Sequence, residues 1–187
     1  PSTLTAPDKA GNIAMGASIH SFPVQMTYSG ELDANGDLKS SRNQSVLYGS
    51  MEGALRVVDA SSGAEQSVFV PYDILQDETA SKALVSGQSD KAGVTAGISG
   101  AWVADSAYKV TAEDENSTLV SATKMNVYGG MRMGGKNYYG LDMLTPTAPK
   151  LLFKITGGLG NFSRMVQTWS KPVLANIRYN KKITRVM

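Results

Sequence analysis

The chain has no cysteine, a single histidine (His20) and no long apolar run. Without cysteine it can form neither a disulfide framework, nor a thiol nucleophile, nor a cysteine-based zinc site. No stretch approaches the roughly 18 apolar residues that a membrane-spanning helix needs, so no membrane insertion is expected. Residues 1–11 are small and polar and lack the pattern of an export signal. We interpret them as a linker, in a protein whose export signal has been removed or whose sequence continues in front of residue 1.

Acidic residues are almost missing from the last third of the chain. From residue 121 onward, 11 lysines and arginines stand against one acid, Asp142, which gives this segment a charge of +10. Residues 1–120 carry −8, and the whole chain carries +2. Such a split attracts an anionic partner, but it is also explained by oppositely charged neighbours that pack together. Tyr179 offers a ring for base stacking if that partner is DNA. The candidate patch for an anionic ligand consists of Lys171, Arg178, Lys181, Lys182 and Arg185.

Glycine is frequent, with 19 residues, and most of the glycines lie in short turn-like clusters. This distribution favours many short strands over a few long helices. With 187 residues, of which 42% are hydrophobic and 18% charged, the chain has the composition of one folded domain. We therefore expect an all-β fold.

Two segments of the chain repeat one pattern. Residues 46–51 (Val-Leu-Tyr-Gly-Ser-Met) and 126–131 (Asn-Val-Tyr-Gly-Gly-Met) share an apolar residue followed by Tyr-Gly-small-Met. Each is followed by a turn, a strand that ends at Asp59 or Asp142, another turn and a further apolar strand. Four antiparallel strands per repeat, joined by turns, are typical of the blades of a β-propeller. The strands that lead into the repeats are at residues 21–24, 101–105 and 170–173.

The repeat predicts part of a β-propeller over residues 12–187, with about two four-stranded antiparallel blades and the start of a third. The first blade is expected at about residues 13–90, the second at about 93–160, and the incomplete third at about 165–187. Repeats of this length exceed the common propeller blade, and we attribute the excess to long insertions between strands.

Local patterns add detail to this prediction. Two polar insertions, residues 29–43 and 109–117, fall where hairpin tips are expected. Apolar residues at roughly helical spacing in residues 71–82 predict one short helix between the blades. Asp59 and Asp142 are each followed by a turn. An aspartate at that position accepts hydrogen bonds from the backbone amides of the turn, which is the arrangement of an Asx turn.

The repeated segments resemble the C-terminal, quinoprotein-like propeller of the PilY/PilC-type tip proteins of type IV pili. A first block comprises residues 20–24 (His-Ser-Phe-Pro-Val), 48–65 and 69–71 (Phe-Val-Pro). In this first block Arg56 departs from the pattern, because the family usually has histidine there. The second block is carried by Gly129, Gly130, Gly134, Gly135, Tyr139, Leu141, Asp142 and Pro146. The third block, residues 167–173 (Gln-Thr-Trp-Ser-Lys-Pro-Val), matches the start of a blade.

This resemblance implies a non-enzymatic protein that is exported through the periplasm to the cell surface and the pilus tip. It implies roles in pilus assembly, retraction control and surface adhesion, with DNA uptake in some members. The implied partners are minor pilins, the major pilus fibre and a receptor on a host or abiotic surface. Two alternatives stay open. A quinoprotein-dehydrogenase-like enzyme needs a catalytic aspartate, calcium ligands and a tryptophan under the quinone, and a DNA-binding or other anion-binding propeller module would use the basic C-terminal third.

Asp33, Asn35 and Asp37 have the alternate spacing with which a calcium loop begins. The rest of such a loop is missing, because Gly36 stands at loop position 4 instead of 6 and Gln44 stands where a bidentate glutamate is expected. A hairpin tip with an Asn-Gly turn explains the same residues. For the pilus-tip interpretation calcium is the one cofactor expected, and the resemblance implies that the loop that holds it lies beyond Met187.

Several other features have structural explanations. His20 has no partner cysteine or second histidine, so a turn or a hydrogen bond between blades explains it. The acids of residues 113–115 indicate a solvated loop. Trp102 and Trp169 stand at equivalent blade starts, which favours packing between blades over ligand stacking. The glycines of residues 129–135 lack the Lys-Ser/Thr of a phosphate-binding loop and predict a hairpin with close backbone approach.

Overall fold

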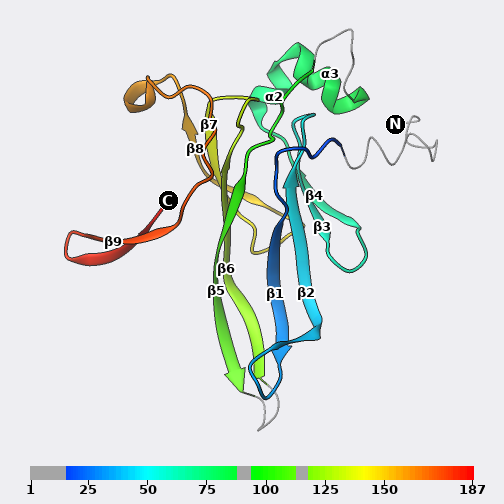
Figure 1. The fold of residues 1–187 in the computed structure, drawn as a ribbon, viewed down its shortest axis with the longest axis vertical. Coiled ribbons are helices and arrows are strands. Elements are labelled where there is room, and N and C mark those ends of the chain that lie inside the picture. Colours follow the sequence, from blue (N-terminus) through cyan, green and yellow to red (C-terminus); the bar gives the residue numbers. More distant parts are fainter. Residues whose placement is uncertain (1–15, 88–93, 113–117) are drawn as a thin grey trace.

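The computed structural model describes residues 16–87, 94–112 and 118–187. The expected linker at residues 1–11 and the acidic loop at residues 113–115 therefore lie outside the described residues. Strands make up 50% of the structure and helices 11%, which confirms the all-β class. Most strands belong to one strongly curled antiparallel sheet that forms a half-barrel (Figure 1).

The first repeat folds as a meander in which consecutive strands pair antiparallel. Two helices follow it where the sequence pattern predicted one, because Asp77 is extended and caps the second helix with its side chain, 2.8 Å from the amide of Ala80. An extended residue interrupts helical hydrogen bonding and starts a new helix. The elements are β1 (Val24–Leu32), β2 (Leu38–Gly49), β3 (Leu55–Asp59), β4 (Glu65–Phe69), α2 (Tyr72–Gln76) and α3 (Glu78–Ser86).

The second repeat forms the same meander, and its strands pair in the same order. Tyr48 on β2 pairs with Arg56, and Tyr128 on the corresponding strand pairs with Gly140, so the two Tyr-Gly motifs occupy equivalent places. The elements are β5 (Trp102–Ala112), β6 (Thr118–Gly130), β7 (Asn137–Asp142), β8 (Lys150–Thr156) and the 3-10 helix η2 (Gly160–Phe162). A separate hairpin of β9 (Ala175–Tyr179) and β10 (Lys182–Val186) follows.

The two meanders are joined edge to edge by their first and second strands. Residues 29–32 of β1 pair with residues 118–121 of β6, while the other end of β6 pairs with β7. The sheet order is thus β4-β3-β2-β1-β6-β7-β8, with β5 on β6. Of the polar insertions expected at the hairpin tips, residues 29–32, 38–43 and 109–112 are strand, while residues 113–117 lie outside the described residues. Figure 1 shows the two long hairpins side by side. This pairing makes one continuous sheet of both repeats.

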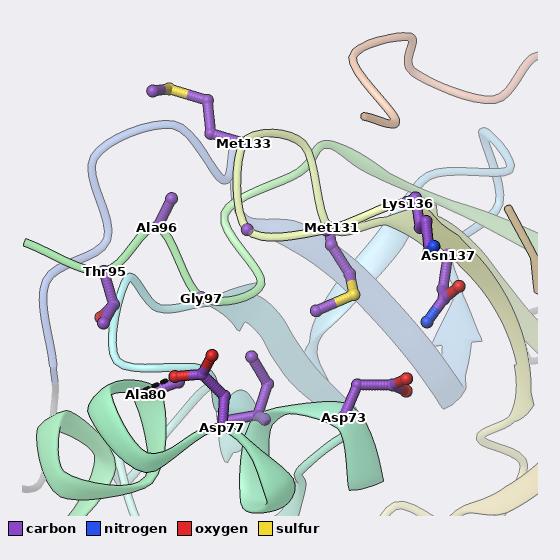
Figure 2. A pocket seen from close by; sticks show the side chains of 13 residues that line it. Asp73, Asp77, Ala80, Thr95, Ala96, Gly97, Met131, Met133, Lys136 and Asn137 are labelled. Atoms are coloured by element: carbon purple, nitrogen blue, oxygen red, sulfur yellow. Dashed lines mark hydrogen bonds between the residues drawn. The ribbon is translucent and has the colours of Figure 1, made fainter. Parts of the chain in front are cut away.

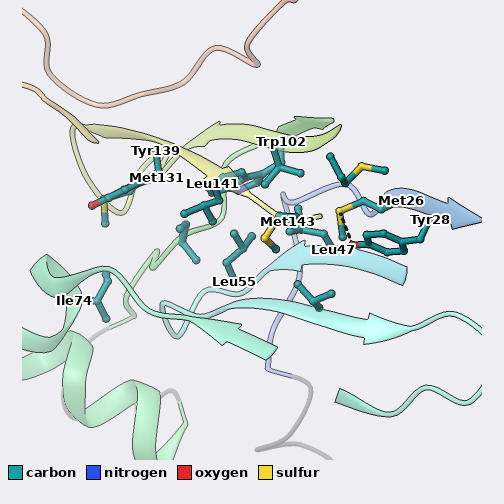
Figure 3. Packing of buried hydrophobic residues seen from close by; sticks show 14 of the residues in the cluster. Met26, Tyr28, Leu47, Leu55, Ile74, Trp102, Met131, Tyr139, Leu141 and Met143 are labelled. Atoms are coloured by element: carbon teal, nitrogen blue, oxygen red, sulfur yellow. Dashed lines mark hydrogen bonds between the residues drawn. The ribbon is translucent and has the colours of Figure 1, made fainter. Parts of the chain in front are cut away.

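The core lies inside the curl of this sheet and takes residues from both repeats (Figure 3). Leu47 pairs with Val57 in the first meander, and Val127 pairs with Leu141 in the second, so the alternation of the strands points all four side chains inward. A Cβ on Gly129 would lie 2.2 Å from the ring of Trp102. The other members of the cluster are Met26, Tyr28, Leu55, Ile74, Ala80, Ile98, Met125, Met131, Tyr139 and Met143.

Candidate functional site: a cleft between the two repeats

A cleft of about 330 Å³ lies where the helices of the first repeat face the glycine hairpin between β6 and β7 (Figure 2). Its volume is at the lower end of the range found for small-molecule sites. One wall comes from α2 and α3, another from the segment before β5, and the third from the hairpin. The lining residues are Asp73, Ile74, Asp77, Ala80, Thr95, Ala96, Gly97, Met131, Met133, Gly134, Gly135, Lys136 and Asn137.

The walls are held together by backbone contacts that depend on glycine. A Cβ on Gly134 would lie only 1.8 Å from the carbonyl oxygen of Gly97, so the hairpin lies directly against the segment before β5. That segment is fixed to the first repeat, because the amide of Ile98 donates to the carbonyl of Ser50 at 3.0 Å. The prediction of a hairpin with close backbone approach is confirmed.

A polar network connects helix α2 to the second repeat at one end of the cleft. The hydroxyl of Tyr139 donates to Asp73 Oδ2 at 3.1 Å and accepts from Asn137 Nδ2 at 3.3 Å. The ammonium of Lys154, on β8, donates to the same oxygen of Asp73 at 2.6 Å. Tyr139 is 2% exposed, whereas the side chains of Lys154 and Asp73 are 30% and 40% exposed, so only the tyrosine end of the network is removed from water. Hydrogen bonds to a charged group are stronger than neutral ones, which suits this network to joining the repeats.

The network shifts the pKa values of its members. Partial burial opposes the charged form of Asp73, but the hydrogen bonds from Lys154 and Tyr139 outweigh it and lower the pKa of this carboxyl. Burial raises the pKa of Tyr139 well above its usual value. Asp73 is therefore ionised and Tyr139 neutral at neutral pH, as their hydrogen-bond directions require.

Two acceptors of the cleft have spare capacity. The side chain of Asp77 accepts from the amide of Ala80, and the described residues provide no cation for it. Asn137 is 3% exposed, and its Oδ1 has no hydrogen-bond partner among the described residues. Figure 2 shows the Asn137 side chain extending from the hairpin with its amide nitrogen, rather than its oxygen, on the side of the helices. A buried carbonyl oxygen without a donor is costly to stability, and this oxygen has almost no surface accessible from the cleft.

The predicted calcium residues form the tip of the β1–β2 hairpin, far along the sheet from the cleft. Asp33 Oδ1 accepts from the amides of Asn35 at 2.9 Å and of Asp37 at 3.0 Å. The Asn-Gly turn explains this geometry, with Gly36 at a φ of 85°. Within residues 16–87, 94–112 and 118–187 no three His, Asp or Glu side chains gather as a metal site. Calcium at Asp33, Asn35 and Asp37 stays a prediction.

The predicted basic patch is distributed over both faces of the β9–β10 hairpin. Arg178 pairs with Ile183 and Arg185 with Asn176, so both arginines lie on one face, whereas Lys182 pairs with Tyr179 on the other. Lys181 is in the turn, with a φ of 63°. Lys171 lies in the segment before the hairpin.

One of the arginines of this patch has an intramolecular partner. The Nε of Arg185 donates to Asp105 Oδ1 at 3.2 Å, and Lys124 binds the other oxygen of Asp105 at 2.5 Å. Asp105 is buried on β5, so these contacts attach the hairpin to the second repeat. At Arg185, therefore, the positive charge of the C-terminal segment is explained by packing against an oppositely charged neighbour.

The predicted Asx turns are confirmed. Asp59 Oδ1 accepts from the amides and hydroxyls of Ser61 and Ser62, and Asp142 Oδ1 accepts from the amide of Leu144 at 2.9 Å. The hydroxyl of Ser61 contributes most, and together these bonds lower the pKa of Asp59 to about 2. Both aspartates are structural.

The two tryptophans of the blade starts have different surroundings. Trp102 is 1% exposed and packs in the core shared by the repeats, while its packing between blades stays a prediction. Trp169 is 53% exposed and lies under the guanidinium of Arg132, 4.8 Å from its ring centre. His20 is half-buried near the start of the first repeat.

Fold and site together define an all-β protein with two repeated meanders and a cleft between them. Comparisons of the chain with protein families, with curated proteins and with solved structures find no match. None of the described helices has the length and apolar character needed to cross a membrane.

Proposed function

We propose that this chain is a non-enzymatic binding and assembly module of the PilY/PilC type, which acts at the tip of a type IV pilus in pilus biogenesis and surface adhesion. The observation that carries the proposal is the equivalence of the two meanders, whose Tyr-Gly motifs pair at the same place on the second strand. These motifs are the segments on which the family resemblance rests.

Contacts of each unit with the segment that leads into the next, though different in kind, support a propeller-like arrangement of the units. The amide of Ile98, in front of β5, bonds to Ser50 of the first Tyr-Gly-small-Met motif at 3.0 Å. Thr168, in front of β9, accepts through its hydroxyl from the amide of Met131 at 2.8 Å, in the second motif. Each leading segment thus binds the motif of the unit before it. Radial repetition of one unit requires such a recurrent contact.

The test is deletion of the gene in the native bacterium, with piliation and attachment as readouts. We expect loss of surface pili or of attachment, and restoration by the unaltered gene. A gene with Gly129→Val, which forces a branched side chain into the ring of Trp102, is expected not to restore them. Val85→Ala is the control, because the Val85 side chain on α3 is 70% exposed. Normal pili and normal attachment of the deletion strain would contradict the proposal.

Binding of DNA or another polyanion is a second candidate function. It is favoured by the exposed β9–β10 hairpin, on which Lys182 shares a face with Tyr179, 62% exposed, and Lys181 lies in the adjoining turn. We expect single-stranded DNA to bind with an affinity that falls as salt is raised, because the basic side chains release counterions. Substitution of Lys181 and Lys182 by glutamine is expected to reduce the salt slope by about 1 to 2, and Lys82→Gln on α3 to leave it unchanged. An affinity independent of salt excludes this function.

A further inference from the structure

We propose that copies of this chain associate head to tail, with helix α2 of one copy seated in an apolar groove at the second repeat of the next copy. The proposal concerns the surface of this chain and does not depend on the pilus role. It joins two exposed surfaces that lie on different elements and carry opposite charge, so the occupant of the groove is a second copy of the same chain.

The groove lies where strands β7 and β8 meet the segment that follows them. Its volume is about 270 Å³. Of the described residues that line it, Lys171 alone carries a charged side chain. Phe162 is 46% exposed, so the groove is open to solvent. The apolar lining side chains that form its walls are Tyr138, Ile155, Phe162, Met165 and Pro172.

The segment that lines the groove is less covered than its counterpart in the first repeat. Helices α2 and α3 follow the first meander and bury Ile74, Ala80 and Ala83. The 3-10 helix η2 follows the second meander, and none of its three residues is buried. Next to it in the chain, Leu159 and Val166 are 63% and 72% exposed. Exposed apolar side chains gathered beside an apolar groove indicate an interaction surface.

Helix α2 presents an exposed apolar face that suits such a groove. Tyr72 and Leu75 are three residues apart, so they lie on the same side of the helix, and they are 68% and 52% exposed. Ile74, which is 4% exposed, holds the helix against the core. Insertion of apolar side chains at positions i and i+3 of a helix into a groove is a common mode of recognition. No residue of α2 lines the groove of its own molecule, so the helix comes from a second copy.

The two surfaces carry opposite charge. Asp77 and Glu78 follow α2, and the side chain of Glu78, which pairs with Lys82, is 83% exposed. Arg164 and Lys171, on the segment that lines the groove, form no ion pair within the described part of the chain. The whole sequence is divided in the same way, with −8 on residues 1–120 and +10 on the remainder. A head-to-tail contact brings these opposite charges together, whereas a contact between two grooves would bring like charges together.

The association is tested by analytical ultracentrifugation of the full chain over a range of concentrations. We expect an average mass that rises with concentration, because each copy offers one helix and one groove and a contact between unlike surfaces builds chains or closed rings. Raising the salt concentration from about 50 mM to about 500 mM is expected to weaken the association several-fold, since the charges at its edge are exposed and screened.

Two variants each remove one side of the contact. Leu75→Gln removes an apolar side chain from α2 and keeps a good helix former, and Phe162→Ser removes a wall of the groove. Each is expected to raise the dissociation constant at least about tenfold. Lys171→Glu is a second groove variant that changes only a surface charge, and it is expected to weaken association in the same direction. Val85→Gln, at a side chain on α3 that is 70% exposed, is the matched control and leaves association unchanged. Circular dichroism verifies the fold of each variant.

A mixture of the two apolar variants distinguishes a head-to-tail contact from a symmetric one. The Leu75→Gln chain keeps an intact groove, and the Phe162→Ser chain keeps an intact α2. At a concentration where each variant alone is monomeric, an equimolar mixture is expected to form a dimer with one copy of each. Growth stops there because the remaining helix and the remaining groove are both altered. A contact that uses the same face of both copies is not restored by mixing.

Three results would overturn the proposal. The first is a chain that stays monomeric up to about 0.5 mM at low salt, which leaves the groove to a different partner. The second is self-association of undiminished strength in Leu75→Gln or in Phe162→Ser, which places the contact elsewhere. The third is a mixture of the two variants that stays monomeric although both chains are folded, which makes the contact symmetric.

Discussion

Removal of one hydroxyl group, by Tyr139→Phe, tests whether the polar network holds the two repeats together. The phenylalanine keeps the edge-to-face contact with Phe69, whose ring centre is 5.6 Å away, so only the hydroxyl is lost. Asp73 then loses one of its two side-chain donors, and both polar atoms of the buried Asn137 amide are left without a partner. A hydrogen bond to a charged group and a buried amide without a partner each contribute about 1–3 kcal/mol.

We expect Tyr139→Phe to lower the free energy of unfolding by about 2–3 kcal/mol. The assay is urea denaturation at pH 7, followed by tryptophan fluorescence, which reports on the buried Trp102. The midpoint is expected to fall and the denaturant slope to stay constant, because the change removes stability without altering the surface exposed on unfolding.

The neighbouring residue provides the control. The hydroxyl of Tyr138 donates to the carbonyl of Ser170 at 3.0 Å in an exposed place, where water replaces the lost bond. Tyr138→Phe is expected to cost less than about 1 kcal/mol. Equal effects of the two substitutions, within about 0.5 kcal/mol, refute the assignment of the network as the connection between the repeats.

Three further predictions concern other parts of the chain. Hydrogen bonds lower the pKa of the Asp59 carboxyl to about 2, so its contribution to stability is present above about pH 4 and is lost as the pH falls toward 2. Asp59→Asn is therefore expected to flatten the dependence of the unfolding free energy on pH between about pH 4 and 2. Gly129→Ala is expected to cost about 1–3 kcal/mol by overpacking against Trp102, and less in a Trp102→Leu background, as a double-mutant cycle measures. Arg185→Gln removes the bond to Asp105, and hydrogen exchange of β9–β10 is expected to accelerate, because an isolated hairpin is only marginally stable; unchanged exchange rates contradict that role.

The sequence predicted much of the strand order, because its signals are local. The Tyr-Gly motifs at Tyr48 and Tyr128 end the second strands as expected, and Asp59 and Asp142 form the expected Asx turns. These features depend on alternation and turn chemistry within a few residues. The arrangement of the units as separate blades stays a prediction.

The pairing of β1 with β6 was not predicted, because polar, alternating segments such as residues 29–43 and 109–117 fit a loop as well as a long hairpin. Nothing in the periodicity of a strand says which edge it will pair with. The lengths of these segments, and Val110 among the polar residues of the second, were the available signal.

The cleft could not be found from sequence, since its three walls come from separate segments. Asp73 and Asp77 fell within the predicted helix, and Asn137 within a segment assigned to a hairpin, so each was explained by its local role. Only the folded chain shows that Asn137 lines the cleft and that its side-chain oxygen is buried without a donor.

Strand β6 pairs with β1 at one end and with β7 at the other, and this has a consequence for the folding of the protein. The strand cannot complete its hydrogen bonds until β1, from the first half of the chain, is in place beside it. Pairing between such distant segments carries a large loop-closure cost and delays folding relative to a tandem of independent modules. We therefore expect the two repeats to fold as one cooperative unit. Cleavage of the chain between them would leave an unpaired strand edge in each half, and such edges promote aggregation.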